Sequence, residues 1–148
     1  MDNNVLNKML RPKSVAVIGA SATPGKIGYT VIKNLLDGGY EGKIYPINNN
    51  TPEILGLKAY PNVTDVPGEV DSAIVTVPAK YMNEVTEECG KKGVKGMIVI
   101  TSGFSEVGRK DLDDQMMEIA TKYKMRILGP NIVGTLSNSD KFNGSFAP

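Results

Sequence analysis

The chain has 148 residues, of which 41% are hydrophobic, and it carries 17 basic residues, 16 acidic residues and no histidine. This size fits one α/β domain with a sizeable core, and a net charge of +1 leaves no basic field for nucleic acid or a membrane surface. Without histidine, the residues exclude His-based acid–base catalysis and phosphohistidine chemistry, and the single Cys89 excludes an intramolecular disulfide. We expect no metal site, no signal peptide and a cytoplasmic location.

Short apolar runs alternate with amphipathic helical patterns along most of the chain. In chain order, these patterns predict a helix at 5–10, a strand at 14–19, a helix at 25–37, strands at 44–47, 54–60 and 73–77, a helix at 81–93, a strand at 97–100, a helix at 112–123 and a strand at 127–128. Such alternation is typical of right-handed βαβ units, so we predict an α/β fold with a doubly wound, Rossmann-like parallel sheet. The domain is expected to span 1–135, with 136–148 as a polar tail or linker toward a following domain.

The segment from Ser14 to Gly28 predicts a buried strand, a glycine-rich loop and the start of a helix. A continuous apolar run at 15–18 is followed by glycines at 19, 25 and 28. A turn of this kind presents free backbone N–H groups at the positive end of a helix dipole, where phosphate binds well. The sequence therefore predicts a phosphate-bearing ligand at this loop.

The loop does not match the P-loop of nucleoside triphosphatases. Gly25 and Lys26 fit the core of that motif, but Ala20 stands in place of its first glycine and Ile27 in place of its hydroxyl residue. No residue of the loop is suited to hold magnesium, so an NTPase is disfavoured.

The dinucleotide-binding fingerprint is also incomplete. Thr23 occupies its first glycine position, and the second strand ends in Asn48, Asn49 and Asn50 instead of the acid that binds the ribose of NAD. Amides tolerate a phosphorylated ribose that a carboxylate would repel. A Rossmann dehydrogenase or redox sensor is therefore the disfavoured alternative.

Ligands of doubly wound sheets bind outside the carboxyl ends of the strands. The loops expected there are 20–26, 48–50, 78–80, 101–104 and 129–134, and they carry hydroxyls, amides, glycine and proline. Because no carboxylate pair or nucleophile–base pair occurs among them, we predict binding without a catalytic residue. The charges at 84, 87, 88, 91 and 92 are expected to form a solvated helix face, with Cys89 buried on the opposite side.

An ordered set of motifs carries a family resemblance. In chain order the motifs are SVAVIGAS, PGKIG, GLKAYPNVTDVP, VDSAIVTVPA, ECGKKGVKGMIVITSGFSEVG and RILGPN. From about Leu10 to Gly134 the chain resembles the CoA-binding domain of NDP-forming acyl-CoA synthetases. That family includes ADP-forming acetate–CoA ligases and is related to the succinyl-CoA synthetase α subunit.

The resemblance implies that coenzyme A lies across the strand ends and assigns residues of this chain to its binding. They belong to the first CoA loop, the segment beside the nucleotide, the segment along the pantetheine and the G-P-N motif near the thiol. In that order they are Gly19, Ser21, Gly25, Lys26 and Ile27; Val77, Pro78 and Ala79; Ile100, Thr101 and Ser102; and Asn131. We add Asn48, which stands near the expected 3′-phosphate.

Alternative structural roles stay open for several of these residues. They are strand-to-helix packing for the glycines, a solvated first helical turn for Lys26, the start of a helix for Pro78, and helix capping for Thr101 and Ser102.

The chain departs from the family pattern at two places. Asn49 and Asn50 stand where members often have Pro followed by Lys or Arg, so one counter-charge for a phosphate is absent. Ile132 follows the G-P-N motif where a cysteine is usual, so no thiol lies beside the reacting end.

The resemblance further implies the N-terminal part of an ADP-forming acyl-CoA (acetyl-CoA) synthetase, which binds CoA for acyl transfer via an acyl phosphate. In the family, a histidine in a flavodoxin-like domain receives the phosphoryl group and passes it to ADP in a nucleotide-grasp domain. Because this chain has no histidine, we expect it to be inactive alone and to have those domains or subunits as partners. The alternative is a stand-alone CoA- or nucleotide-binding regulatory module without catalysis.

Overall fold

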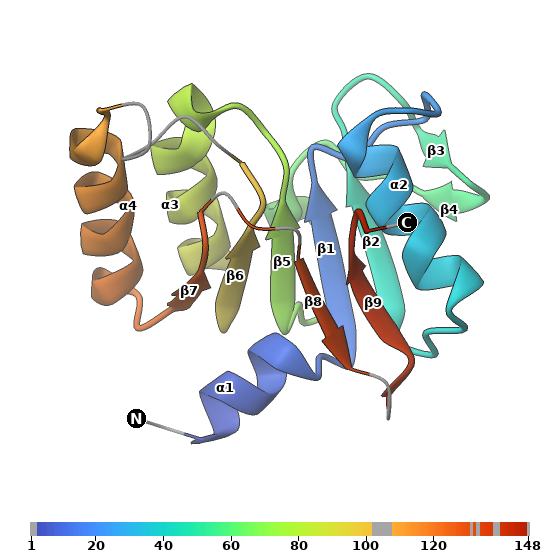
Figure 1. Cartoon of the computed structure of the whole chain (residues 1–148), viewed down its shortest axis with the longest axis horizontal. Helices are drawn as coiled ribbons and strands as arrows, with labels where there is room; N and C mark the ends of the chain where they lie inside the picture. The colour runs from blue at the N-terminus through green and yellow to red at the C-terminus, as the bar shows by residue number, and fades with distance from the viewer. Residues whose placement is uncertain (1–2, 102–107, 131, 133, 138–139, 148) are drawn as a thin grey trace.

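The computed structural model describes residues 3–101, 108–130, 132, 134–137 and 140–147. A five-stranded parallel sheet with the order β2-β1-β5-β6-β7 forms the middle layer (Figure 1). Its strands are β1 (Ser14–Ile18), β2 (Lys43–Ile47), β5 (Ser72–Val75), β6 (Gly96–Val99) and β7 (Arg126–Leu128). The chain runs outward from β1 to β2 and then returns to add β5 on the other side of β1. This reversal confirms the predicted doubly wound sheet.

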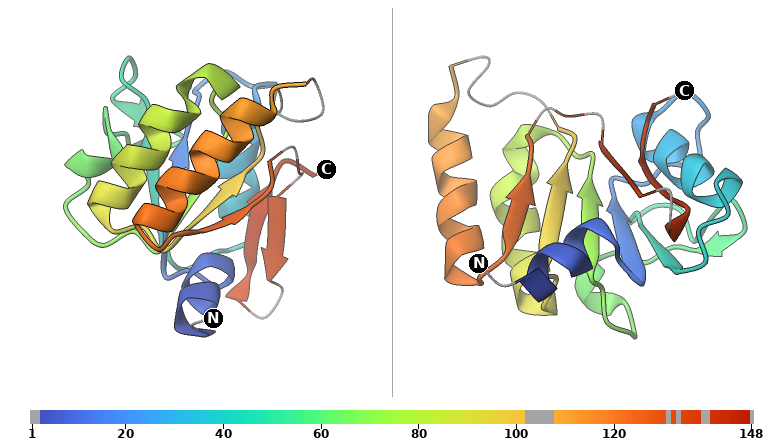
Figure 2. Two further views of the ribbon diagram at one scale, coloured as in Figure 1. Left: turned by 90° about the vertical axis from the view of Figure 1, so that its left-hand side faces the viewer. Right: turned by 60° about the horizontal axis from the view of Figure 1, so that its bottom comes forward.

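Both faces of the sheet are covered, as the continuous apolar run of β1 predicts. Side chains alternate between faces along a strand, so Val15 and Val17 join one core while Ala16 and Ile18 join the other. The first face carries α1 (Asn3–Leu10) and α2 (Ile27–Asp37), and the second carries α3 (Met82–Lys92) and α4 (Lys110–Lys122) (Figure 2). Among the described helices, none is long and apolar enough to cross a membrane.

Helix α3 shows how local sequence sets the ends and the buried side of an element. Its C-cap Gly93 has φ +87°, and the N–H of this glycine donates to the carbonyls of Cys89 and Gly90. Cys89 is fully buried, as predicted, and burial raises the pKa of its thiol well above the ordinary value.

The segment expected to be one strand at 54–60 is instead a small hairpin. Strand β3 (Glu53–Ile54) pairs antiparallel with β4 (Leu57–Lys58). Leu55 and Gly56 have φ values of +50° and +81°, which turn the chain back on itself. Two short 3₁₀ helices follow, η1 (Val63–Asp65) and η2 (Ala79–Tyr81).

A second hairpin occupies much of the segment that we expected to be a tail or linker. Strand β8 (Gly134–Ser137) pairs antiparallel with β9 (Phe142–Ser145), and the hairpin packs on the same face as α2 (Figures 1 and 2). Phe142 is 1% exposed and meets the ring of Tyr40 edge-on at 5.3 Å between centroids. The carboxamide of Asn34 donates to the carbonyls of Ser145 (2.8 Å) and Ala147 (2.9 Å). The hairpin is therefore part of the folded unit, and a following domain stays a prediction.

Candidate functional site

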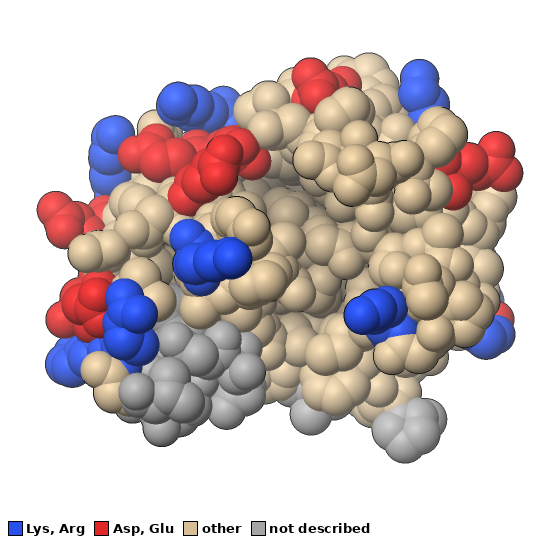
Figure 3. Space-filling model, turned by 90° about the horizontal axis from the view of Figure 1, so that it is seen from above, with Lys and Arg blue, Asp and Glu red and all other residues tan. Residues whose placement is uncertain are grey.

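Two adjoining cavities lie at the carboxyl ends of the parallel strands. The β2-side cavity, about 500 Å³, lies between the loops after β1 and β2 and the start of α3. The β6-side cavity, about 520 Å³, lies between the start of α2 and the loops after β5 and β6. Val77 and Pro78 line both cavities, so the two hollows share one wall. Figure 3 views this end of the molecule and shows a hollow whose floor is mostly uncharged, with acidic and basic residues around its rim.

Most predicted site residues line these two cavities. Gly19 and Asn48 line the β2-side cavity, together with the shared Val77 and Pro78. The β6-side cavity adds a further set, which is Ile27, Ala79, Ile100 and Thr101. Ser21, Gly25 and Lys26 lie in the loop between β1 and α2 and line neither cavity. Ser102 and Asn131 lie outside the residues that the structure describes.

The three glycines of the loop differ in what surrounds them. A Cβ on Gly28 would lie 2.0 Å from the carbonyl oxygen of Gly19, and one on Gly19 would lie 2.3 Å from Oγ1 of Thr76. These two positions need glycine for close packing of strand and helix. Gly25 has φ +94°, and a Cβ added there would meet no atom within 4 Å, so this glycine borders open space.

The N-terminus of α2 is open toward the strand ends. Its N-cap Lys26 has an extended backbone and makes no side-chain hydrogen bond to the first turn. The hydroxyl of Ser21 accepts the N–H of Thr23 (3.0 Å) within the loop and does not reach the helix. The side chain of Ile27 is 43% exposed. Unpaired N–H groups and the helix dipole together favour an anion at this point.

The side chain of Asn48 is hydrogen-bonded to backbone on both sides. Its Nδ2 donates to the carbonyl of Ala20 (2.8 Å), while its Oδ1 accepts the N–H groups of Asn50 (2.7 Å) and Thr51 (3.0 Å). The next two asparagines, Asn49 and Asn50, are exposed and line the β2-side cavity. Asn48 therefore holds two loops together, a role that its position at the end of a strand does not reveal.

Two threonines hold the loops around the β6-side cavity. The hydroxyl of Thr101 donates to the carbonyl of Val77 at 2.5 Å, and Thr101 is 8% exposed. The hydroxyl of Thr76 lies 3.1 Å from the carbonyls of both Ile18 and Gly19. Thr76 is not among the predicted site residues, because nothing in the local sequence shows that it meets carbonyls of another strand.

Sequence reasoning also missed the acidic wall of the β2-side cavity. Glu84 and Glu88 of α3 line it, although their charges predicted only a solvated helix face. Tyr81 lines it as well, and the ammonium of Lys80 lies 5.1 Å from the centre of that ring. Since carboxylates repel phosphate, this cavity suits an uncharged group better than a phosphate. The N-terminus of α2 is the more favourable place for a phosphate.

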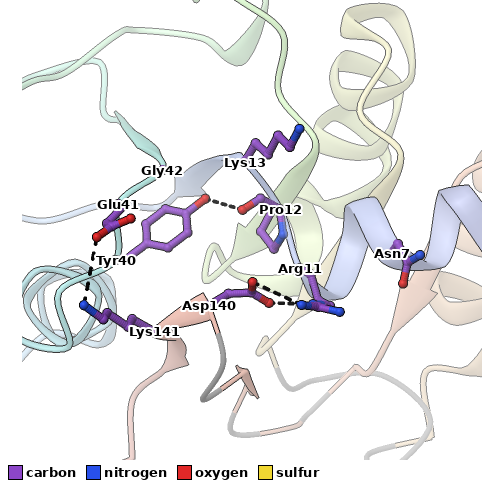
Figure 4. A pocket seen from close by; sticks show the side chains of 9 residues that line it. All are labelled: Asn7, Arg11, Pro12, Lys13, Tyr40, Glu41, Gly42, Asp140 and Lys141. Atoms are coloured by element: carbon purple, nitrogen blue, oxygen red, sulfur yellow. Dashed lines mark hydrogen bonds and ion pairs between the residues drawn. The ribbon is translucent and has the colours of Figure 1, made fainter.

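A separate cavity of about 600 Å³ lies at the opposite end of the sheet (Figure 4). There Arg11 Nε pairs with Asp140 Oδ2 at 2.6 Å, and the Tyr40 hydroxyl donates to the Pro12 carbonyl at 2.6 Å. Burial raises the pKa of Tyr40, so its hydroxyl stays protonated and keeps this donor role. None of the predicted site residues that the structure describes lines this cavity. The Arg11–Asp140 pair joins the end of α1 to the β8–β9 hairpin, and the Tyr40–Pro12 bond joins the segment after α2 to the segment before β1.

Comparison with known proteins identifies the family of the chain. A family profile described as CoA binding domain matches residues 13–137. The alpha subunit of ADP-forming acetate–CoA ligase I from Pyrococcus furiosus is 52% identical over 149 residues, which cover 97% of this chain and 32% of that protein. The ADP-forming acetate–CoA ligase of Methanocaldococcus jannaschii is 52% identical over 136 residues, which cover 92% of this chain and 19% of that protein.

A solved structure shares the same fold over nearly the whole chain. The dinucleotide-forming acetyl-coenzyme A synthetase 1 of Ca. Korarchaeum cryptofilum, in complex with phosphate and ADP, matches with a TM-score of 0.95 and 47% identity. The match covers 97% of this chain and 31% of that one, so the chain spans about a third or less of these relatives. The resemblance carried by the sequence motifs is confirmed, and the chain belongs to the family of CoA-binding domains.

Proposed function

We propose that this chain binds coenzyme A across the carboxyl ends of its parallel strands. The observation that carries the proposal is the pair of cavities joined along Val77 and Pro78, with the open N-terminus of α2 beside them. An elongated ligand with a nucleotide at one end and a flexible arm at the other needs two connected hollows. A compact nucleotide needs only one.

The chemistry of the two cavities suggests an orientation for the ligand. The β6-side cavity is lined largely by apolar groups such as Ile27, Val77 and Ile100, which suits the pantetheine arm. The β2-side cavity has amides and a tyrosine, which suit the uncharged adenine base. In this orientation the pyrophosphate lies at the start of α2, where N–H groups and the helix dipole favour negative charge.

The chain then serves as the CoA-binding domain of an ADP-forming acyl-CoA synthetase, with acetate or another short acid as the acyl substrate. The relatives named above support this, since they are ADP-forming ligases of greater length. Catalysis requires further domains or subunits, a His-bearing flavodoxin-like domain and a nucleotide-grasp domain, because these 148 residues contain no histidine to carry a phosphoryl group.

Titration calorimetry of the chain with CoA and with NADH tests the binding proposal. We expect CoA to bind more tightly, because no acidic residue stands at the end of β2 to hold the ribose hydroxyls of NADH. Tighter binding of NADH would refute the proposal. A second assay mixes the chain with acetyl phosphate and ADP. We expect no ATP, and ADP-dependent ATP formation by this chain alone would show that it holds a catalytic group of its own.

A further inference from the structure

Three consecutive carbonyl groups at the end of β1 are held by side chains of the neighbouring strands. Oγ1 of Thr76, from the β5 side, lies within 3.1 Å of the carbonyl oxygens of Ile18 and Gly19. Nδ2 of Asn48, from the β2 side, donates to the carbonyl of Ala20 at 2.8 Å. Each of these oxygens lies within hydrogen-bond distance of a protein donor, which offsets part of its negative charge beside the loop that follows.

Asn48 is the member of this set that connects two loops. Its Oδ1 accepts the N–H groups of Asn50 and Thr51, so one side chain fixes both the loop after β1 and the loop after β2. The backbone adds one further link here, from the N–H of Ala20 to the carbonyl of Ile47 at 3.3 Å. A carboxamide donates and accepts at the same time, whereas an ionised carboxylate can only accept.

We propose that Asn48 is a positioning residue: it sets the separation of the two loops that form the β2-side cavity and does not contact the phosphate of the ligand. The sequence alone predicts the opposite arrangement, with Asn48 near the 3′-phosphate of CoA. In our proposal an ionised acid does not fit at this position because it cannot donate to the carbonyl of Ala20. This reason does not depend on whether the ligand has a 3′-phosphate. The ligand-binding arm of the test rests on the proposed CoA function.

The test compares CoA with dephospho-CoA, which lacks the 3′-phosphate. Affinities are measured by titration calorimetry for the unaltered chain, Asn48→Asp and Asn48→Ala. Asn7→Asp, at the far end of the sheet, is the control for added charge. We expect both Asn48 variants to lose about tenfold in affinity for both ligands, because the loops are no longer held together. A loss confined to CoA in Asn48→Asp would overturn the proposal, since it would place the side chain at the phosphate. Unchanged affinity in both variants would overturn it as well.

Acidification separates positioning from a general loss of structure. A protonated carboxyl has one donor and one acceptor, so it can replace the carboxamide between Ala20 and Asn50. The carbonyl of Ala20 raises the pKa of the new acid, and the N–H groups of Asn50 and Thr51 lower it. We expect Asn48→Asp to regain affinity for dephospho-CoA as the pH falls through that pKa. Tyr81, Glu84 and Glu88 line the same cavity. The same pH series on the unaltered chain and on Asn48→Ala therefore serves as the reference for pH effects shared by the whole cavity. A lack of recovery specific to Asn48→Asp would contradict the proposal.

Amide hydrogen exchange without ligand tests the role of Asn48 independently of the proposed CoA binding. Amide hydrogen exchange of residues 19–28 and 48–51 is compared between the unaltered chain and Asn48→Ala, with Asn48→Ser as a second variant if either of the others fails to fold. We expect faster exchange in both loops of the variant, while the amides of α4 stay unchanged. Equal exchange in both loops would overturn the positioning role. If the unaltered chain binds neither CoA nor dephospho-CoA, the proposed function fails, and the exchange result still decides the role of Asn48.

Discussion

The described contacts at the amino end of the parallel sheet include an ion pair, whereas neutral side chains hold the loops at the carboxyl end. At the carboxyl end, the neutral side chains of Asn48, Thr76 and Thr101 hydrogen-bond to backbone carbonyls. At the amino end, the charged pair of Arg11 and Asp140 joins segments that are 129 residues apart. These neutral bonds to the backbone fix loop positions without adding charge to the cavities. In our proposal the carboxyl end holds the ligand, while the ion pair at the amino end closes the fold.

The largest effect that we expect is a loss of stability when the core near the amino end of the sheet is changed. Phe142→Ala removes a fully buried ring from the core beneath the β8–β9 hairpin. We expect the free energy of unfolding to fall by about 3–5 kcal/mol, as for other buried Phe-to-Ala changes. Urea unfolding measures this loss. CoA affinity under conditions where the variant is folded should be unchanged, and a loss below about 1 kcal/mol would mean that the hairpin is not part of the core.

The second prediction concerns ligand affinity at the carboxyl end. Gly25→Val adds a β-branched side chain where Gly25 borders open space near the start of α2. We expect CoA affinity to fall tenfold or more, which corresponds to about 1.4 kcal/mol, because the side chain blocks the approach of phosphate to the backbone. Titration calorimetry measures the change.

The matched control for this variant is Gly56→Val. Gly56 has φ +81°, close to the +94° of Gly25, and it likewise has no atom within 4 Å of an added side-chain carbon. Both variants should lose about 1–2 kcal/mol of stability from the same backbone strain, but only Gly25→Val should lose affinity. Equal affinity losses would show that the effect of Gly25→Val comes from strain, and the loop would then not be the phosphate site.

The fold was largely predictable because parallel strands covered on both faces produce unbroken apolar runs, such as 15–18, that are easy to recognise. The β8–β9 hairpin was not, because the apolar side chains that its second half gives to the core are Phe142 and Phe146, in an otherwise polar segment. Two aromatic residues separated by Asn, Gly and Ser do not establish a period, so nothing in the local pattern distinguishes the segment from a tail.

The place of the two cavities was predictable from the sequence, but the contacts that shape them were not. Loops after β1, β5 and β6 do line the cavities, because the doubly wound topology brings carboxyl ends together. The bond of Asn48 to Ala20 joins residues 28 positions apart, and that of Thr76 to Ile18 joins residues 58 positions apart, so no local pattern contains either bond. Glu84 and Glu88 show helical spacing that fits a solvated face, and only the position of α3 over the strand ends turns them toward a cavity.

Two substitutions of Thr101 distinguish a role in holding the loop after β5 from direct contact with the ligand. Thr101→Val removes the hydroxyl that donates to the carbonyl of Val77, while Thr101→Ser keeps it. We expect Thr101→Val to lose about 1 kcal/mol of stability and only a few-fold in CoA affinity, with Thr101→Ser closer to the unaltered chain in both. Thermal unfolding and calorimetry give the two values. A tenfold loss of affinity without loss of stability would instead identify the hydroxyl as a direct contact to the ligand.

The smallest expected effect is at the amino-end ion pair. Arg11→Gln removes the charge that lies 2.6 Å from Asp140, but the Arg11 side chain is 55% exposed and the Asp140 side chain 32%. Asp140 raises the pKa of Arg11 through a hydrogen bond, yet the guanidinium is charged at every pH where the protein is folded, so no pH dependence follows from it. Because water and salt screen an exposed pair, we expect little change in the melting temperature at moderate salt and none in CoA affinity. Repeating the melt at low and high ionic strength checks the reason, since any difference between the two proteins should shrink as salt increases. A clear loss of CoA affinity in this variant would show that the two ends of the sheet are coupled. It would contradict the assignment of ligand binding to the carboxyl end and of fold closure to the amino end.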